Sequence, residues 1–262
     1  MMIKSQPFKI KLEEKFPHLS KAPIMECVLE LRARAETPWE ENAIREPLVK
    51  QLPDYPKFQS EQEFQAELTL QAKEKQAEHT FKDLGLKGII FRTNDEKQIA
   101  RFHRDLFSFS KLHPYDDWSQ FSTEALRLWA IHRELARPID IQRIGLRFIN
   151  HISVPTGTFK LEDYLRIYPK EPYGLPLPFG GFFHKDRFAV PGYNYFMDVV
   201  KTIQPDPKTM AVSLVIDIDV FTGKSIAIED AGCLKKCLLE MWWLKNKAFF
   251  GSITKKTMEM LK

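Results

Sequence analysis

Cysteine is scarce in this chain of 262 residues, which contains only Cys27, Cys233 and Cys237. An odd number of thiols without a disulfide framework is typical of a protein that stays in a reducing compartment. The stretch before Ala22 has no apolar run of signal-peptide length, and no segment reaches the roughly 18 consecutive apolar residues that cross a bilayer. The sequence therefore predicts a cytoplasmic protein that does not associate with a membrane.

The chain also lacks the short motifs that mark common catalytic and nucleotide-binding sites. It contains no G-x-x-x-x-G-K-[ST], G-x-G-x-x-G or H-E-x-x-H pattern, and no G-x-S-x-G nucleophile elbow. We therefore predict no cofactor and favour a protein without enzymatic activity. The charges are nearly balanced, because 39 basic and 35 acidic residues leave a formal net charge of +4. This balance does not require a nucleic-acid partner, although it leaves room for a local basic patch.

What the sequence does contain is a long strand pattern near its middle, between Pro138 and Pro155. Apolar residues occupy alternate positions, interrupted by Asn150: Ile144, Leu146, Phe148, Ile152 and Val154. The positions between them include Arg143, Arg147 and His151. Because successive side chains of a strand point to opposite faces, this segment predicts a half-buried strand with a cationic outer face.

Similar patterns on both sides of this strand predict the other elements. Alternation predicts strands at 23–34, 64–73, 88–93, 98–111 with a bulge near Asp105, 187–203 and 209–221. Helical spacing predicts helices at 37–52 with Thr37 as N-cap, from Asp116 or Asp117 to a residue before Pro138, at 161–167 and at about 228–260. The two halves of the chain therefore repeat a β-α-β-β(-β)-α order.

Short antiparallel connections and segregated helices indicate an α+β protein. We expect a mainly antiparallel sheet with helices packed on one face, built from pseudo-duplicated halves at about 22–137 and 138–262. These halves would form a single domain, preceded by an N-terminal arm at 1–21 that can become ordered against it. The outline would resemble the saddle of the TATA-binding protein fold, a topological likeness that carries no function.

Several segments resemble a sporadically distributed family of uncharacterised prokaryotic proteins. The resemblance rests on Ser110–Tyr115 with Trp118 and Phe121, on Arg143–Asn150, on Ala22–Ile24 and on Ile216–Asp219. It covers nearly the whole chain from Ala22 to the final helix, where Trp242 and Trp243 stand in place of a more polar face. The resemblance implies a stand-alone cytosolic protein and defines no catalytic residues for this chain.

The outward face of the predicted sheet is the main candidate for a functional site. On these strand assignments it carries Glu26, Glu30, Arg32, Glu67, Arg101, His103, Arg143, Arg147, His151, Asp217 and Asp219. One interpretation is a solvated face on which Arg143 or Arg147 pairs with Asp217 or Asp219 across strands. The other is an open concave face that binds an anionic ligand, because arginine forks match phosphate and carboxylate groups. The predicted anion contacts are Arg143, Arg147, His151, Arg101 and His103.

Two further chemistries are compatible with residues of this face. Asp217 and Asp219 lie on the same side of one strand, and such a pair can hold Mg²⁺ if a third carboxylate is adjacent. That arrangement would belong to a metal-dependent phosphoryl-transfer enzyme or nuclease. His103 and His151 are of the residue type that titrates near neutral pH, but no recognisable serine or cysteine nucleophile accompanies them.

Aromatic residues outside the predicted sheet face indicate a partner surface. The segment 168–186 is rich in proline, glycine and aromatic residues, and we interpret it either as core folded over the sheet edge or as a lid. Trp242 and Trp243 point to opposite flanks of the last helix, which favours contact with a partner or a second copy. The predicted partner surface comprises Tyr173, Phe179, Phe182, Phe183, Trp242 and Trp243.

Together these patterns predict a cytosolic binding protein that engages a protein partner or an anionic ligand through its polar sheet face and aromatic loop. A homodimer is compatible with the same features. Nucleic-acid binding by the same face is the first alternative, although the mixed charge disfavours it. A metal-dependent enzyme centred on Asp217 and Asp219 is the second.

Overall fold

The computed structural model describes residues 8–33, 37, 39–70, 77–138, 140–154, 159–170, 181–205, 212–227 and 231–262, with the backbone alone at 66–70, 77–81, 226–227 and 231. Nine strands form one antiparallel sheet: β1 (Ile24–Arg32), β2 (Lys57–Leu70), β3 (Ala77–Arg92), β4 (Gln98–His103), β5 (Leu106–Leu112), β7 (Arg143–Val154), β8 (Phe183–Ala189), β9 (Tyr195–Pro205) and β10 (Val212–Thr222). From edge to edge their order is β2-β3-β4-β5-β1-β7-β10-β9-β8. Two short strands, β6 (Asp140–Ile141) and β11 (Ile226–Ala227), pair with each other.

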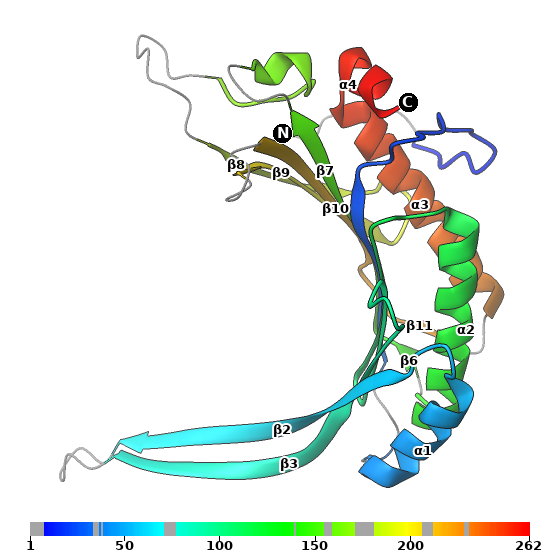
Figure 1. Cartoon of the computed structure of the whole chain (residues 1–262), viewed down its shortest axis with the longest axis vertical. Helices are drawn as coiled ribbons and strands as arrows, with labels where there is room; N and C mark the ends of the chain where they lie inside the picture. The colour runs from blue at the N-terminus through cyan, green and yellow to red at the C-terminus, as the bar shows by residue number, and fades with distance from the viewer. Residues whose placement is uncertain are drawn as a thin grey trace.

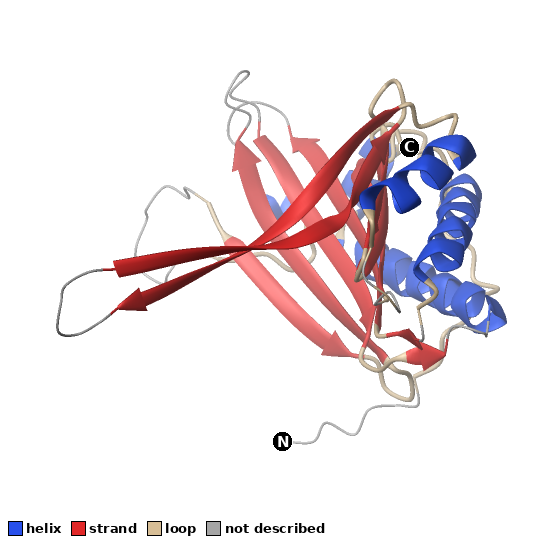
Figure 2. Ribbon diagram, turned by 90° about the horizontal axis from the view of Figure 1, so that it is seen from below, coloured by secondary structure: helices blue, strands red, loops and turns tan. Residues whose placement is uncertain are grey.

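Helices α2 (Trp118–Ala136) and α3 (Ala231–Ser252) lie along the convex face of the curved sheet, and the described elements leave its concave face open (Figure 1). Helix α1 (Glu41–Gln51) lies beside α2, and α4 (Lys255–Leu261) follows α3. Figure 2 shows from below that the helices stay on one side of the sheet. The predicted α+β fold, with a saddle-like antiparallel sheet and helices on one face, is confirmed. Within the described part of the chain, no helix has the length and apolar character needed to cross a membrane.

The strand order shows how the two halves are related. Strands β1 and β7 lie side by side at the centre and run antiparallel. Outward from β1 the order is β5, β4 and β3, and outward from β7 it is β10, β9 and β8. Each half therefore starts with its central strand, returns to the centre through a meander, and continues into α2 or α3. Among the described elements, β2 has no counterpart in the second half.

The core lies between the sheet and the two long helices. On β7, Ile144, Leu146 and Phe148 are fully buried, as the alternation of the sequence predicts. The helices meet them with apolar residues at helical spacing, which on α2 include Phe121, Ala125 and Leu128. Both layers follow directly from the period of the hydrophobic pattern, because a period of two faces one side of a strand and a period near 3.6 faces one side of a helix.

The N-terminal segment packs against α3. Phe16 lies between two of its rings, stacked on Phe250 at a centroid distance of 5.8 Å and edge-on to Trp242 at 5.9 Å. Glu14 accepts hydrogen bonds from the indole nitrogen of Trp243 (3.0 Å) and from Lys247 (2.7 Å). The described part of the predicted arm is therefore ordered against the domain.

Two strands that the sequence predicts as continuous are hairpins. Residues 98–111 form β4 and β5, which reverse direction at Arg104 and Asp105. Most of the predicted strand at 187–203 belongs to β8 and β9, which reverse through a loop that contains Gly192 at φ +80°. A tight turn was mistaken for a bulge because both shift the alternation by one residue.

Several boundaries also differ from the predicted ones. Helix α1 has Glu40 as its N-cap residue, so Thr37 does not cap it. The predicted helix at 161–167 is a single 3-10 turn, η1 (Leu161–Asp163). The last helix is interrupted before Thr254, whose hydroxyl accepts a hydrogen bond from the backbone N–H of Thr257 at the start of α4.

The predicted strands at 64–73 and 88–93 are parts of the longer hairpin β2–β3. Met25 of β1 is exposed, at the point where the pairing of β1 with β7 shifts its register between Ile24 and Glu26.

A histidine in the core has an unusual environment. His132 of α2 is completely buried and stacks on Trp129 at a centroid distance of 5.4 Å, with Phe107 at 5.6 Å. Neither ring nitrogen has a hydrogen-bond partner among the described residues. Burial lowers the pKa of His132 to about 3, so the folded protein holds the neutral imidazole.

The pH dependence of stability tests this assignment. The unfolded chain takes up a proton at His132 near the ordinary pKa of about 6.5, whereas the folded protein resists it down to about pH 3. Stability should therefore fall as the pH drops below about 6.5, by up to about 1.4 kcal/mol per pH unit from this residue. Between pH 7 and pH 5 the free energy of unfolding, measured in urea, should fall by about 2 kcal/mol less in His132→Leu than in the native chain. The exposed substitution His18→Leu is the control, and an unchanged pH dependence in His132→Leu would contradict the assignment.

Candidate functional site

The register of the sheet brings charged side chains from several strands onto the concave face. Arg147 of β7 is opposite Val28 of β1 and Asp219 of β10. Asp219 is opposite Asp198 of β9, which in turn is opposite Arg187 of β8. Directly opposite residues of antiparallel strands point to the same side, so these residues form one row across the concave face.

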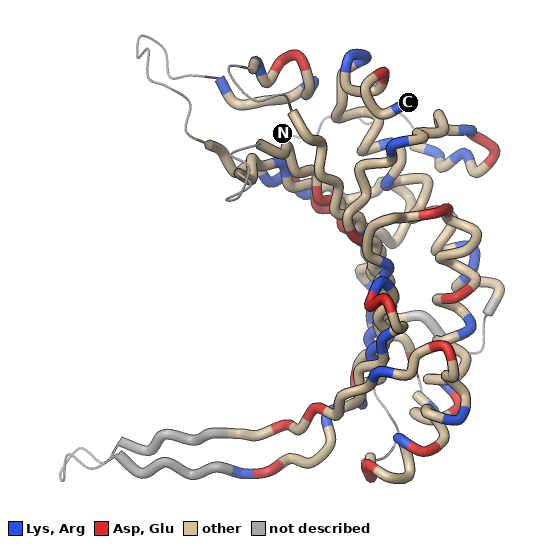
Figure 3. The backbone as a smooth tube through the Cα atoms, in the orientation of Figure 1, with Lys and Arg blue, Asp and Glu red and all other residues tan. Residues whose placement is uncertain are grey.

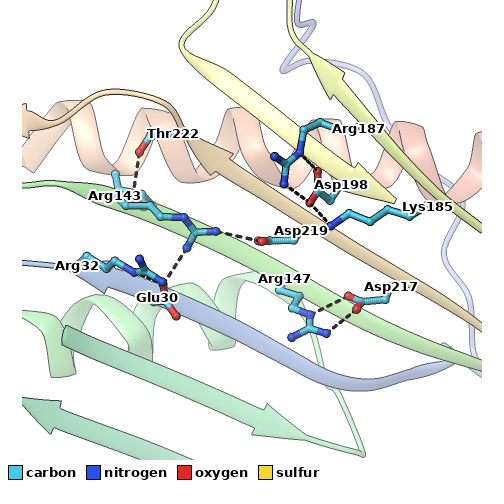
Figure 4. A network of polar contacts seen from close by, with 11 residues as sticks. Glu30, Arg32, Arg143, Arg147, Lys185, Arg187, Asp198, Asp217, Asp219 and Thr222 are labelled. Carbon is cyan, nitrogen blue, oxygen red and sulfur yellow. Dashed lines mark hydrogen bonds and ion pairs between the residues drawn. The ribbon is translucent and has the colours of Figure 1, made fainter. Parts of the chain in front are cut away.

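Arg143 connects the two halves of the sheet (Figure 4). Its guanidinium donates to Glu30 on β1 at 2.8 Å and to Asp219 on β10 at 3.0 Å. The group lies across Gly145, where a Cβ atom would come within 2.5 Å of Nη1, so the bare backbone there makes room for it. Burial raises the pKa of the Asp219 carboxyl, while the nearby Arg143 and Arg147 guanidinium groups lower it.

Arg147 forms a bidentate pair with Asp217. Its Nε donates to Oδ1 at 2.8 Å and its Nη2 to Oδ2 at 2.5 Å. The hydrogen bond to Asp217 raises the pKa of Arg147. This pair is exposed to solvent, and such an ion pair stabilises a protein by about 0–1 kcal/mol. These are the cross-strand pairs that the solvated-face interpretation predicts, and they mean that Arg143 and Arg147 already hold carboxylates.

A second cluster, which the sequence analysis missed, continues the row at its outer end. Asp198 accepts two hydrogen bonds from Arg187, both at 2.7 Å, and lies 3.0 Å from the amino group of Lys185. The hydrogen bond from Arg187 is the main cause that lowers the pKa of Asp198 to about 2. The prediction put residues 187 and 198 on one strand. The dipeptide Pro191–Gly192 is the turn signal that could have separated them.

The charges on this part of the concave face balance. Strands β1, β7, β10, β9 and β8 present five described cations and five described carboxylates: Arg32, Arg143, Arg147, Lys185 and Arg187 with Glu26, Glu30, Asp198, Asp217 and Asp219. Figure 3 shows both signs interspersed along the sheet. The strand pattern at 138–155 alone predicts a cationic face, but the five strands together carry as many carboxylates as cations.

An aromatic patch borders these ion pairs. Phe196 of β9 and Phe221 of β10 stack with their centroids 5.8 Å apart. The guanidinium carbons of Arg143 and Arg187 lie 4.7 Å and 5.6 Å from the centre of the Phe221 ring, within reach of a cation–π interaction. Phe183, at the start of β8, projects from the same face and is 72% exposed. The concave face therefore combines fixed charge pairs with accessible rings.

The other predicted anion contacts lie apart from this network. His151 is half-buried opposite Val215, and burial lowers its pKa. Arg101 lies on β4, which β5 and β1 separate from β7. His103 is buried beside Glu61, with Nε2 3.1 Å from the carboxylate but without hydrogen-bond geometry, and burial lowers its pKa. The structure thus brings Arg143 and Arg147 together and spreads the three remaining residues along the face.

Asp217 and Asp219 are engaged by arginines. Among the described residues, no group of three His, Cys, Asp or Glu side chains is placed to hold a metal ion. The carboxylates of the pair accept from Arg147 and Arg143 respectively. We therefore derive no metal-dependent step from this strand.

The residues of the predicted partner surface are dispersed. Tyr173 and Phe179 lie outside the described residues. Phe182 packs partly against the core, whereas its neighbour Phe183 is exposed. Trp242 and Trp243 both contact the N-terminal segment, so at least part of each indole is covered within the chain. Phe183 is the member of this set that the structure places on the concave face.

A buried lysine lies on the side of β7 that faces the helices. The amino group of Lys245 is 4.0 Å from the centre of the Phe148 ring and donates to Asn246 at 2.8 Å. Burial lowers the pKa of Lys245 to about 8, and burial also raises the pKa of the neighbouring Cys27 thiol. A lysine with this pKa is a potential nucleophile, but Lys245 is only 6% exposed and Cys27 is fully buried. These contacts are structural, because the Phe148 ring and the Asn246 amide oxygen stabilise the buried amino group of Lys245.

No model of a known protein family matches the chain, and no curated protein sequence is significantly similar to it. The resemblance to a prokaryotic family therefore stays a prediction, and the function must be argued from the geometry of the concave face.

The contact between Arg143 and Gly145 gives a direct test of this geometry. Gly145→Ala should displace the guanidinium from Glu30 and Asp219 and lower the free energy of unfolding by about 1 kcal/mol. In an Arg143→Ala background the same change should be neutral or stabilising by about 0.5 kcal/mol, because alanine is favoured over glycine in a strand. Urea unfolding of the four proteins measures the difference.

Gly88→Ala is the matched control. A Cβ atom there would lie 2.3 Å from the backbone oxygen of Phe102, which cannot move aside as a side chain can. This change should destabilise the protein equally with and without Arg143. An equal cost of Gly145→Ala in both backgrounds would show that the guanidinium does not occupy the space over Gly145.

Proposed function

We propose that the chain is a non-enzymatic binding protein that holds a protein partner against the concave face of its sheet. The observation that carries the proposal is the combination of paired charges and exposed rings on a sheet face that the described helices leave open. Arginine and aromatic residues are enriched in protein–protein interfaces, especially among the residues that contribute most to affinity. The β2–β3 hairpin extends toward the same side and enlarges the available surface (Figure 1).

The ion pairs favour a protein over a small anion. An anionic ligand that bound Arg143 or Arg147 would have to displace Glu30, Asp217 or Asp219 from its hydrogen bonds. A displaced carboxylate near the sheet surface loses its partner, and that cost opposes ligand binding. A protein surface with its own mixed charges can instead add to the existing network without breaking it.

The balance of charge also disfavours nucleic acid. Affinity for nucleic acid depends on cations that release counterions from phosphates. Here five cations face five carboxylates of the same chain, so the row offers little net charge to a polyanion. We place the binding protein in the cytoplasm, in keeping with its three free thiols. A homodimer through the concave face would be one form of the proposed protein contact.

Photo-crosslinking from two phenylalanine positions of β8 tests the proposal. Phe183 and Phe188 are both exposed, at 72% and 46%, but they lie on opposite faces of the strand. We would replace each in turn with a photoreactive phenylalanine in the full chain and irradiate the cells in which the protein occurs. A discrete polypeptide adduct is expected from Phe183 and not from Phe188. Arg147→Glu, which places a third carboxylate beside Asp217 and Asp219, should abolish the adduct and leave the thermal unfolding transition in place.

Three results would refute the proposal. Equal adducts from both positions would show that the concave face is not selective. A nuclease-sensitive adduct that disappears steeply with salt would identify nucleic acid as the ligand. A normal adduct in the folded Arg147→Glu protein would place the contact away from the charged row.

A further inference from the structure

A groove on the convex side, between α2 and α3, is separate from the concave face. It has a volume of 570 Å³ and is bordered by both helices. Its larger apolar lining residues are Trp118, Leu126, Trp129, Leu234, Leu238 and Leu239. Trp129, Leu234 and Leu238 are buried and form the floor, whereas Leu239 is 42% exposed. Leu239 therefore leaves apolar side-chain surface exposed beside the buried floor of the groove.

The groove follows the axis of α2. Lining residues run along this helix from Trp118 to Arg133, which at 1.5 Å per residue corresponds to a length of about 22 Å, or roughly four turns. At one end the rings of Trp118 and Trp242 stack at 5.9 Å and join α2 to α3. A trough of this length between two helices matches a third helix, because ridges of one helix pack into the grooves of others.

The rim of the groove has one sign of charge. Its described lining residues include three cations, Arg127, Arg133 and Lys235, and no carboxylate. Arg127 is paired with Glu124 through hydrogen bonds of 2.6 Å and 2.8 Å. Arg133 near the end of α2 and Lys235 near the start of α3 are exposed. A segment in the groove would therefore have these two cations beside it, and acidic residues would complement them.

We propose that this groove docks an amphipathic helix of a partner protein, with apolar residues at i, i+3 or i+4, and i+7 facing the floor and acidic residues along its edges. The helix buries Leu239 and the rings of the floor, and its carboxylates pair with Arg133 and Lys235. The proposal does not depend on the function of the concave face, because the two surfaces lie on opposite sides of the sheet.

A pair of synthetic helical peptides tests the occupant. Both carry the same leucine stripe over about 15 residues, which matches the length of the groove, and their flanking positions are glutamate in one and lysine in the other. Fluorescence anisotropy with the full chain should show at least tenfold tighter binding of the glutamate peptide. Exchanging the rim charges with Arg133→Glu and Lys235→Glu together should reverse the preference.

A matched pair of variants locates the binding site. Leu239→Glu should weaken binding of the glutamate peptide tenfold or more, whereas Val49→Glu should leave it unchanged. Val49 is 43% exposed, lies on α1 and is not a lining residue, so both changes put a carboxylate at an equally exposed helical position. Equal affinity for the two peptides, no measurable binding of either, or no effect of Leu239→Glu would overturn the proposal. Self-association of the native chain that Leu239→Glu abolishes would identify a second copy as the occupant and would also overturn it.

Discussion

The pairing of β1 with β7 is the interaction on which the rest of the structure depends. It joins the two halves, and its register decides which side of each half faces the helices. Leu29 and Leu146 are opposite each other in the core, while Val28 and Arg147 are opposite each other on the concave face. A shift of one residue would turn the arginines into the core and the leucines into solvent. The cost of burying unpaired guanidinium groups makes this register far more stable than its neighbours.

The charged row carries the same register outward. Because Arg143 bonds to β1 and β10 at once, it fixes three strands relative to one another at the point where the halves meet. Gly145 makes that geometry possible by leaving the space over the strand empty. The pairs also neutralise a face that would otherwise repel itself, since Arg143, Arg147 and Arg187 each lie next to a carboxylate of a neighbouring strand. A sheet face with this composition cannot be covered by apolar helices, so both long helices pack on the other side.

Much of this architecture could be predicted from the sequence, and the missing parts have a common cause. The alternation between Pro138 and Pro155 was sufficient to place Arg143 and Arg147 on one face and Phe148 on the other. Alternation alone could not show where the chain reverses elsewhere, because the turn at Arg104 shifts the pattern by one residue as a bulge does. Nor could it show the acids that meet the arginines, because strand neighbours depend on the whole topology. For that reason the face that one strand predicts to be cationic is neutral in the structure.

The two candidate surfaces differ in the physical basis of their selectivity. On the concave face Arg143, Arg147 and Arg187 already have carboxylate partners, so a ligand gains little from charge alone, and shape and ring contacts must supply the affinity. On the convex side the groove has an apolar floor with cations at its edge, so apolar burial supplies affinity and the cations select acidic neighbours. The first surface is built by residues far apart in the chain, and its composition emerges only when the strands are aligned. The second is built by two helices whose stripes are visible in the sequence, but their spacing is set by the sheet beneath them. Both surfaces thus depend on the central pair of strands, which fixes the faces of the sheet and the positions of the helices that pack on it.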